Sequence, residues 1–375
     1  METKKIVIVG TAYPYRGGIA NFNERVATEF ESKGHNVEIY TFTLQYPSFL
    51  FPGKTQYSTE KSDNKLNIKR KVNSINPFNW IRVGLELKKM KPDIIVFRHW
   101  TPFMAPCLGT ISRIAKKNKH SEIKLIVDNV FPHEKLPFQK MLAKYIIKSA
   151  DSVVVMSKKV LSDLKQVAPK VNGSFLYHPL YDNYGKAIDK QEAIRQLNID
   201  ANYKYLLFFG FIREYKGLDI LLKSLAIDKI RNSNIKLIVA GEFYDDEAKY
   251  QIIISDYNIA DKVVMFNTYI SNSQIPVLFS ACDLVVQPYK SATQSGVAQL
   301  AYFYEKPMVI TNVGGLHEIV PDNKVGYVVN PDPQEIADAI FKFFDEQKAA
   351  EFTENIKVEK QRFSWSTFVN ELLGN

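Results

Sequence analysis

Residues 205–219 read YLLFFGFIREYKGLD, an apolar run followed by a loop with two glycines and two cations. The run Tyr205–Phe209 has the length and composition of a strand buried on both faces of a parallel sheet. A strand, a glycine-containing loop and a helix form the repeating unit of doubly wound sheets. The stretch therefore predicts an α/β fold with functional residues at the ends of strands.

Runs of the same kind recur along the chain, each followed by a helical period. They span Ile6–Val9, Val37–Tyr40, Ile94–Phe97, Lys124–Val127 and Ser152–Val155 in the first half, and Tyr205–Phe209, Lys236–Ala240, Val263–Phe266, Leu284–Gln287 and Met308–Ile310 in the second. Two sets of about five strands predict two doubly wound, Rossmann-like domains. Ligands bind at the carboxyl ends of such sheets, so we expect the domains to face each other across a crevice.

The domain boundary is expected near residues 176–183, where Pro179 and several turn formers follow the last strand of the first set. This gives an N-terminal domain at residues 1–178 and a C-terminal domain at residues 179–357. Residues 358–375 contain Trp365 and Phe368 on an expected helix, which we predict to pack back on the N-terminal domain.

Composition indicates a soluble globular enzyme. Of 375 residues, 46% are hydrophobic and 24% are charged, which suits a chain of two domains. Cys107 and Cys282 stand far apart and outside any metal-binding spacing. The first apolar run is too short for a signal peptide, and no later stretch is long enough to cross a bilayer. We therefore expect a cytoplasmic protein.

The charge is unevenly distributed. Residues 1–178 contain 29 Lys and Arg against 14 Asp and Glu, whereas the remainder contains 20 against 26. A basic first half indicates an anionic partner, such as nucleic acid, an anionic membrane surface or a phosphate-bearing acceptor. A surface that merely keeps the protein soluble would give the same composition, and both interpretations stay open.

The first loop motif, GTAYPYRGGI at residues 10–19, lies between the first strand and the first helix. Gly17 and Gly18 allow the backbone to approach a ligand closely, and the helix N-terminus favours a phosphate. The spacing is not that of a dinucleotide fingerprint, and a simple turn would look similar. We assign Tyr13 and Arg16 of this loop to the acceptor side.

The second motif comprises Gly210, Arg213 and Lys216 of the opening stretch. The guanidinium offers a bidentate fork and the ammonium a compact charge, a combination that suits a diphosphate. A diphosphate gains charge as it leaves, so cations held there would accelerate bond cleavage. Two ordinary surface cations are the alternative, but their position after a strand favours a binding role.

The third motif is SATQSGVAQ, residues 291–299, before a helix. Ser295, Gly296 and Val297 would cradle a phosphate at the helix N-terminus, and Gln299 one turn later would hydrogen-bond a ribose. Simple N-capping by Ser295 would explain the serine equally well.

Three residues after first-half strands are further candidates. His133 could contact a sugar hydroxyl, and His99 and Trp100 could line the acceptor side. A lone histidine is more often structural, so the position of each histidine after a strand is by itself weak support for a binding role.

These motifs, in this order, resemble glycosyltransferase family 4, whose members have the GT-B fold. The landmarks include residues 210–222, Ala240-Gly241-Glu242, 305–309, 311–315 and 326–328. The resemblance implies that Arg213 and Lys216 bind the donor diphosphate, that His133 lies at the reacting sugar, and that Gly17 and Gly18 approach the phosphates. It also places Gly241 and Glu242 at the donor, and the backbone of Ile270 at the nucleotide base.

The resemblance implies a retaining transfer from a nucleotide-diphosphate sugar, which is a co-substrate, so no cofactor is expected. No Asp-x-Asp set off by aromatics occurs, so we expect no metal. The chain departs from the family in one respect: the usual pair of glutamates before Lys306-Pro307 is missing, and Gln299 is the nearest polar residue to the second. The donor sugar is therefore unassigned.

We expect a hexosyltransferase acting on a glycan or lipid-linked acceptor in surface polysaccharide or glycoconjugate synthesis. A nucleotide-sugar epimerase of the same fold is one alternative, with Glu134 and Glu242 as candidate bases. A basic nucleic-acid-binding protein is another, although no aromatics interleave its basic clusters and no reader motif occurs, so we expect no nucleic-acid partner. The apolar segment 46–53 beside basic residues could place the protein peripherally on an anionic membrane; a buried loop is the other interpretation.

Overall fold

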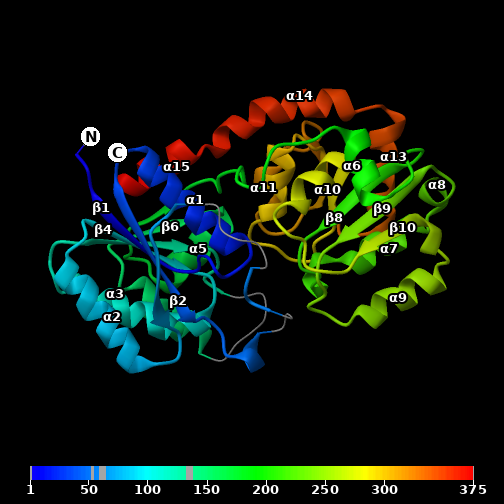
Figure 1. Cartoon of the computed structure of the whole chain (residues 1–375). Helices are drawn as coiled ribbons and strands as arrows, with labels where there is room; N and C mark the ends of the chain where they lie inside the picture. The colour runs from blue at the N-terminus through cyan, green and yellow to red at the C-terminus, as the bar shows by residue number, and fades with distance from the viewer. Residues whose placement is uncertain (1, 52–54, 59–64, 132–137, 375) are drawn as a thin grey trace. The chain divides into compact units, whose positions relative to one another are not determined.

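The computed structural model describes residues 2–51, 55–58, 65–131 and 138–374. The chain divides into two compact units (Figure 1). Unit 1 comprises Met1–Pro179 and Phe363–Asn375, and unit 2 comprises Leu180–Arg362. The C-terminal segment thus belongs to the same unit as the N-terminal half.

The described part of unit 1 is built on a seven-stranded sheet in the order β3-β2-β1-β4-β5-β6-β7. All neighbouring strands are parallel, with Ile6 of β1 opposite Val37 of β2 on one side and Ile94 of β4 on the other. The strands are β1 (Lys5–Val9), β2 (Asn36–Leu44), β3 (Ile68–Asn73), β4 (Ile94–His99), β5 (Glu122–Val127), β6 (Ser152–Val155) and β7 (Gly173–Phe175). The strand order reverses between β1 and β4, which places a ligand-binding edge at their carboxyl ends.

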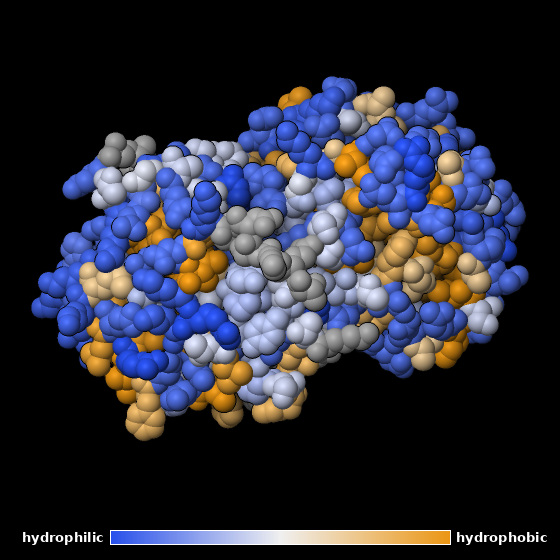
Figure 2. Space-filling model, in the orientation of Figure 1, coloured by the Kyte–Doolittle hydropathy of each residue, from blue (hydrophilic) through white to orange (hydrophobic). Residues whose placement is uncertain are grey.

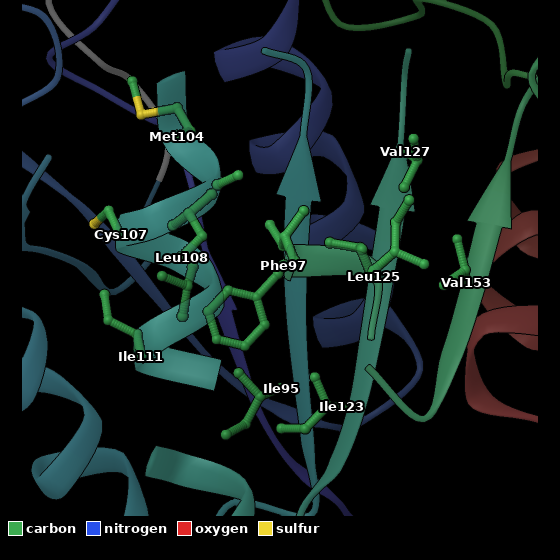
Figure 3. Close-up of a cluster of buried hydrophobic side chains, with 14 of the residues drawn as sticks. Ile95, Phe97, Met104, Cys107, Leu108, Ile111, Ile123, Leu125, Val127 and Val153 are labelled. Atoms are coloured by element: carbon green, nitrogen blue, oxygen red, sulfur yellow. The ribbon is translucent and has the colours of Figure 1, made fainter. Parts of the chain in front are cut away.

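Helices cover both faces of this sheet. They are α1 (Gly18–Ser32), α2 (Pro77–Met90), α3 (Ala105–Lys116), α4 (Gln139–Ile147), α5 (Lys158–Val167) and α15 (Trp365–Leu373), with short 3₁₀ turns η1 (Ser48–Leu50) and η2 (Pro102–Met104). Figure 3 shows one buried cluster, in which Phe97 of β4 points toward Leu108 and Ile111 of α3. Apolar side chains on both faces of the strands explain why the sequence runs are continuous rather than alternating.

The C-terminal helix α15 packs on α1. The Phe22 ring of α1 lies 5.1 Å from Trp365 and 5.6 Å from Phe368, between ring centroids. The Arg25 guanidinium lies 5.0 Å from the centroid of the Trp365 ring. These contacts attach the last residues of the chain to its first helix.

The described part of unit 2 is built on a six-stranded parallel sheet in the order β10-β9-β8-β11-β12-β13. The strands are β8 (Lys204–Phe209), β9 (Ile235–Ala240), β10 (Val263–Phe266), β11 (Leu284–Gln287), β12 (Met308–Thr311) and β13 (Gly326–Val329). The helices are α6 (Lys190–Leu197), α7 (Leu218–Leu225), α8 (Asp228–Arg231), α9 (Glu247–Asp256), α10 (Gln274–Ala281), α11 (Gly296–Phe303), α12 (Leu316–Ile319), α13 (Pro333–Asp345) and α14 (Ala349–Glu359), with 3₁₀ turns η3 (Glu214–Lys216), η4 (Ala260–Lys262) and η5 (Lys360–Phe363). Here the order reverses between β8 and β11.

All ten expected strands are present, but the number of strands was underestimated. The structure adds β3 and β7 in unit 1 and β13 in unit 2. β3 reads IKRKVN, so its sequence looks like a basic surface cluster rather than a strand. It lies at the edge of the sheet, where charged side chains are common. β7 has three residues and β13 has four, too few to show a periodic pattern.

Candidate functional site

The loops after β8 and β11 meet at the switch point of the unit 2 sheet. β8 and β11 are neighbouring parallel strands, so the residues after Phe209 and after Gln287 leave the same edge side by side. A Cβ placed on Gly217 would lie 1.9 Å from the carbonyl oxygen of Pro288, so only glycine permits this approach, and its φ of +69° also favours glycine. The opening stretch and the third motif are thus brought together.

Two direct interactions join these loops. The backbone N–H of Lys290 donates to the carbonyl of Tyr215 at 2.7 Å. The Lys290 ammonium forms an ion pair with Asp219 at 2.9 Å. The pair Asp219–Lys290 was not foreseen from the sequence, and it holds the start of α7 beside the loop that leads to α11.

Gly210 and Gly241 allow the loops after β8 and β9 to pack on each other. A Cβ on Gly241 would lie 2.2 Å from the carbonyl oxygen of Gly210, and one on Gly210 would lie 2.9 Å from the Nζ of Lys216. Both glycines have positive φ, +96° and +156°. The small residue at position 210 therefore creates the space that the Lys216 ammonium occupies.

Lys216 is a buried cation at this edge of the sheet. Lys216 is 9% exposed, and among the described residues no carboxylate forms an ion pair with its ammonium. Burial, and next the charge of Arg213, lower the pKa of Lys216 to about 7. The ammonium lies 5.9 Å from the centroid of the Tyr289 ring. An anion bound here would restore the charged form.

Tyr289 is a site residue that the sequence analysis missed. It follows Pro288 at the end of β11, its ring is buried below Lys216, and burial raises the pKa of its phenol. Its position two residues after a strand of the switch point was the available signal.

The predicted phosphate cradle lies at the N-terminus of α11. Ser295 is the N-cap, and its Oγ accepts a hydrogen bond from the Ala298 N–H at 3.3 Å and donates one to Gln287 Oε1. Gly296 contacts the ring of Tyr181, where a Cβ would lie at 2.9 Å. Val297 is nearly buried, close to Gly210. The capping role of Ser295 is thus observed, and phosphate binding by this terminus stays a prediction.

Gln299 is fully buried on α11. Neither its Oε1 nor its Nε2 has a hydrogen-bond partner among the described residues. Buried amides are nearly always hydrogen-bonded, so this side chain has unused capacity for a ligand or a water. Its contact with a ribose stays a prediction.

A cluster of aromatic rings begins at Arg213, on the other side of the β8 loop. The guanidinium lies 5.2 Å from the centroid of the Tyr244 ring, which stacks on Phe211 at 4.4 Å. Tyr269, next to Ile270, lies 6.3 Å from Phe211. Ile270 is nearly buried and Glu242 is buried. The edge thus presents flat apolar faces beside the two cations.

The candidate residues of the first half follow the carboxyl ends of β1 and β4 in unit 1. Gly17 is the N-cap of α1 with a φ of +103°, and an added Cβ there would meet no atom within 4 Å. Gly18 begins the helix. The N–H of Tyr13 donates to Glu24 at 2.7 Å, and that of Arg16 donates to the carbonyl of Gln56 at 3.0 Å. The glycine position is open, which is compatible with the expected approach of a ligand.

His99 and Trp100 differ in character. His99 ends β4 and is fully buried, and neither ring nitrogen has a partner among the described residues. Burial lowers its pKa to about 4 against the opposing charge of Asp128, so the ring is neutral. Trp100 is half-buried and donates from Nε1 to the Tyr46 hydroxyl at 2.8 Å. His133 lies outside the described residues.

A buried ion pair beside His99 was also missed. Arg98 donates from Nε and Nη2 to the two carboxylate oxygens of Asp128, at 2.7 and 2.8 Å. Both residues are buried, and Phe22 lies under the guanidinium at 4.0 Å. A lone Arg inside a strand and an Asp after another gave no sign of pairing until the register of β4 and β5 was known.

Within the described ranges, no group of three or more His, Cys, Asp or Glu residues is arranged to hold a metal ion. In the same part of the chain, no helix has the length and apolar character needed to span a membrane.

Two family models match the chain, one in each unit. Residues 16–172 match the model described as Glycosyltransferase Family 4, and residues 189–359 match Glycosyl transferases group 1. The chain is a glycosyltransferase of the family 4 type. An uncharacterised glycosyltransferase from Methanocaldococcus jannaschii is 23% identical over 98% of this chain and 97% of its own length. These matches favour transfer over epimerisation and over nucleic-acid binding.

Solved structures show the fold of this glycosyltransferase. A sucrose-phosphate synthase from Thermosynechococcus elongatus has a TM-score of 0.75 at 16% identity, covering 98% of this chain and 97% of the other. The Anabaena protein HepE in complex with UDP-glucose has a TM-score of 0.75 at 18% identity, covering 99% of each chain. The fold is GT-B, with two Rossmann-like α/β domains, as the sequence analysis expected.

Proposed function

We propose that this glycosyltransferase moves a hexose from a nucleotide-diphosphate donor bound at the carboxyl edge of unit 2. The observation that supports this most strongly is Lys216, a buried cation that lacks a carboxylate partner within the described residues. The donor pyrophosphate would complete this site, with Arg213 as a second cation and the N-terminus of α11 as a dipole. HepE, of the same fold, binds UDP-glucose.

The proposed transfer retains the anomeric configuration and needs no metal. The acceptor oxygen forms a bond to the anomeric carbon while the bond from that carbon to the diphosphate oxygen breaks. The acceptor proton passes to the departing diphosphate, on the same face of the sugar. Arg213 and Lys216 would stabilise the charge that develops on the leaving group. Retention is inferred from the family resemblance, and His133 is proposed to contact the transferred sugar.

The remaining donor contacts follow the arrangement of unit 2. Phe211, Tyr244 and Tyr269 offer ring faces for a base. The backbone of Ile270 would read that base, and Gln299 would bind the ribose with its unused amide. Gly17 and Gly18 of unit 1 would approach the phosphates.

The proposed acceptor is a glycan or a lipid-linked sugar, and the proposed pathway is surface polysaccharide or glycoconjugate synthesis in the cytoplasm. Segment 46–51 offers one candidate membrane contact, because Phe49 is 83% exposed. Residues 52 and 53 of that segment lie outside the described part.

A thermal-shift screen of nucleotide sugars tests the donor class. A true donor raises the melting temperature, because it binds only the folded protein. Incubating the stabilising donor without acceptor then separates two activities: a transferase leaves the sugar intact or hydrolyses it slowly, whereas an epimerase converts it. Failure of every nucleotide sugar to raise the melting temperature would contradict the proposal.

A further inference from the structure

Two helices of unit 1, α2 and α4, bury one face against the core and expose large apolar side chains on another. On α2, Phe78 is 84% exposed, Leu85 51% and Ile81 46%. On α4 and the residue before it, Phe138 is 73% exposed and Met141 61%. Such side chains are normally scattered singly over a surface, so their concentration on two helices indicates a binding surface.

The spacing places these residues on one side of each helix. Phe78, Ile81 and Leu85 follow each other at three and four residues, while Val83 and Leu87 of the same helix are buried. On α4, the exposed Met141 and Tyr145 are four residues apart, whereas Ala143 and Ile146 are buried; Phe138 precedes the helix as its N-cap residue. Each helix therefore has a second apolar stripe, which the fold of the chain leaves uncovered.

α3 lies between the two helices and joins them in one layer. α2 packs on it at Gly84, where a Cβ would lie 2.7 Å from Ile114. α4 packs on it at Gly109, where a Cβ would lie 2.8 Å from the Tyr145 ring, and the Arg113 guanidinium lies 3.8 Å from that ring's centroid. The exposed stripes thus belong to one helical layer, and Figure 2 shows hydrophobic atoms over the part of it formed by α2.

The same helices are basic. α4 contains Lys140 and Lys144, both exposed, and no acidic residue. α2 contains exposed Arg82 and Lys89 and a single acid, Glu86, which is already paired with Lys71 at 3.1 Å. Exposed cations beside exposed apolar tips form the pattern of a helix that lies in the interface of an anionic bilayer.

We propose that the outer side of α2 and α4 is a docking surface for a lipid bilayer that contains anionic lipid. We define this docking surface by Phe78, Ile81, Leu85, Phe138, Met141 and the flanking cations. A second copy of the chain is a poor occupant, because it would bring these cations against each other. The proposal deepens the proposed function, since it would hold the acceptor-binding unit at a membrane that contains a lipid-linked acceptor.

Phe78 and Phe138 also lie at the functional end of the unit. α2 follows the carboxyl end of β3 and α4 follows that of β5, so both helices begin at the edge that includes His99 and Trp100. Docking through the first turns of these helices would therefore bring the carboxyl edge of the sheet toward the lipid.

Vesicle sedimentation tests the proposal without a donor. The full chain is mixed with vesicles of phosphatidylcholine alone or with 30 mol% phosphatidylglycerol, a composition chosen at roughly the anionic content that attracts basic segments. We expect pelleting with the anionic vesicles only. Phe78→Ser with Phe138→Ser should lower the partition coefficient about tenfold or more. Lys140→Gln with Lys144→Gln should lower it about 30-fold, at about 1 kcal/mol per cation.

The matched control is Ile252→Ser with Tyr257→Ser, two exposed apolar residues on and after α9 of unit 2. It should pellet like the wild type. Failure of the wild type to pellet, equal pelleting of the surface variants, or an equal loss in the control would each overturn the proposal, as would a dimer in solution that the Phe variants abolish. Donor binding is measured without vesicles and should be the same in every variant as in the wild type. If the wild type bound no donor, that result would contradict the proposed function rather than the docking surface.

Discussion

Each unit of this glycosyltransferase buries a cation near the carboxyl end of a central strand, but only one of them has a carboxylate partner. Arg98 in unit 1 donates twice to Asp128. Lys216 in unit 2 has no such partner among the described residues, and the charge of Arg213 repels it. The first arrangement is complete within the chain. The second would be completed by the anion that we propose binds there.

Under the proposed function, this difference distinguishes a structural charge from one that binds the donor. A buried pair with two hydrogen bonds costs stability when one partner is removed, because the other is left buried and unpaired. A buried cation without a partner already destabilises the free protein, and the ligand offsets that cost. Removal of each charge should therefore have opposite effects on stability, and only one should affect catalysis directly.

The largest effect is expected for Lys216→Met. Turnover with the donor found by screening should fall about 10³-fold, because the leaving diphosphate loses a cation. The melting temperature of the ligand-free protein should rise, since an uncharged side chain is easier to bury. Steady-state kinetics and thermal unfolding measure the two effects, and near-normal turnover would remove the diphosphate from this position. Arg213→Ala should lower turnover similarly.

Asp128→Ala should lower stability by about 3 kcal/mol, because it leaves the Arg98 guanidinium buried without its partner. Denaturant unfolding at pH 7 measures this loss. The double variant Arg98→Met with Asp128→Leu should regain most of it, and Glu192→Gln, which breaks an exposed pair with Arg195, should leave stability unchanged. A single variant as stable as the wild type would show that the pair is not structural.

Acid should destabilise unit 1 through two buried histidines. Burial lowers the pKa of His99 to about 4, and burial with the charge of Arg98 does the same for His178. Both bind a proton more readily when unfolded, so their contribution is present above pH 6.5 and is lost as the pH falls toward 4. The loss should reach about 3 kcal/mol for each histidine by pH 4. His99→Leu should roughly halve the slope of stability against pH, and an unchanged slope would contradict this.

The smallest effect is expected for Gln299→Leu. Donor affinity should fall about fivefold if the amide binds the ribose, at roughly 1 kcal/mol for one hydrogen bond. Stability without ligand should hold, since the amide has no partner among the described residues. Calorimetric titration with the donor measures the affinity, and an unchanged value would exclude this contact.

The fold could be predicted because buried parallel strands leave continuous apolar runs. All ten expected strands were found, whereas β3 was missed because its charged residues suit an edge. The unit 2 loops could be located because glycines and cations follow strands. Tyr289 and the Arg98–Asp128 pair could not, because they depend on which strands are neighbours, and that information is absent from local sequence pattern.

The contacts at the start of α11 are also informative. The loop before α11 contains Ser295, which is held between Gln287 and the Ala298 N–H. Neutral hydrogen bonds thus fix the start of α11. At the same edge of the sheet, Lys216 has no carboxylate ion-pair partner among the described residues.

Calorimetric titration of the nucleotide-sugar donor found by the thermal-shift screen, at pH 8 and in two buffers of different ionisation enthalpy, tests the central claim most directly. The diphosphate diester has no proton that titrates near pH 7, whereas free Lys216, with a pKa of about 7, is mostly neutral at pH 8. Binding should therefore take up about one proton in the wild type. Lys216→Met should bind more weakly and take up almost none. Equal affinity and equal proton uptake in the two proteins would contradict the account.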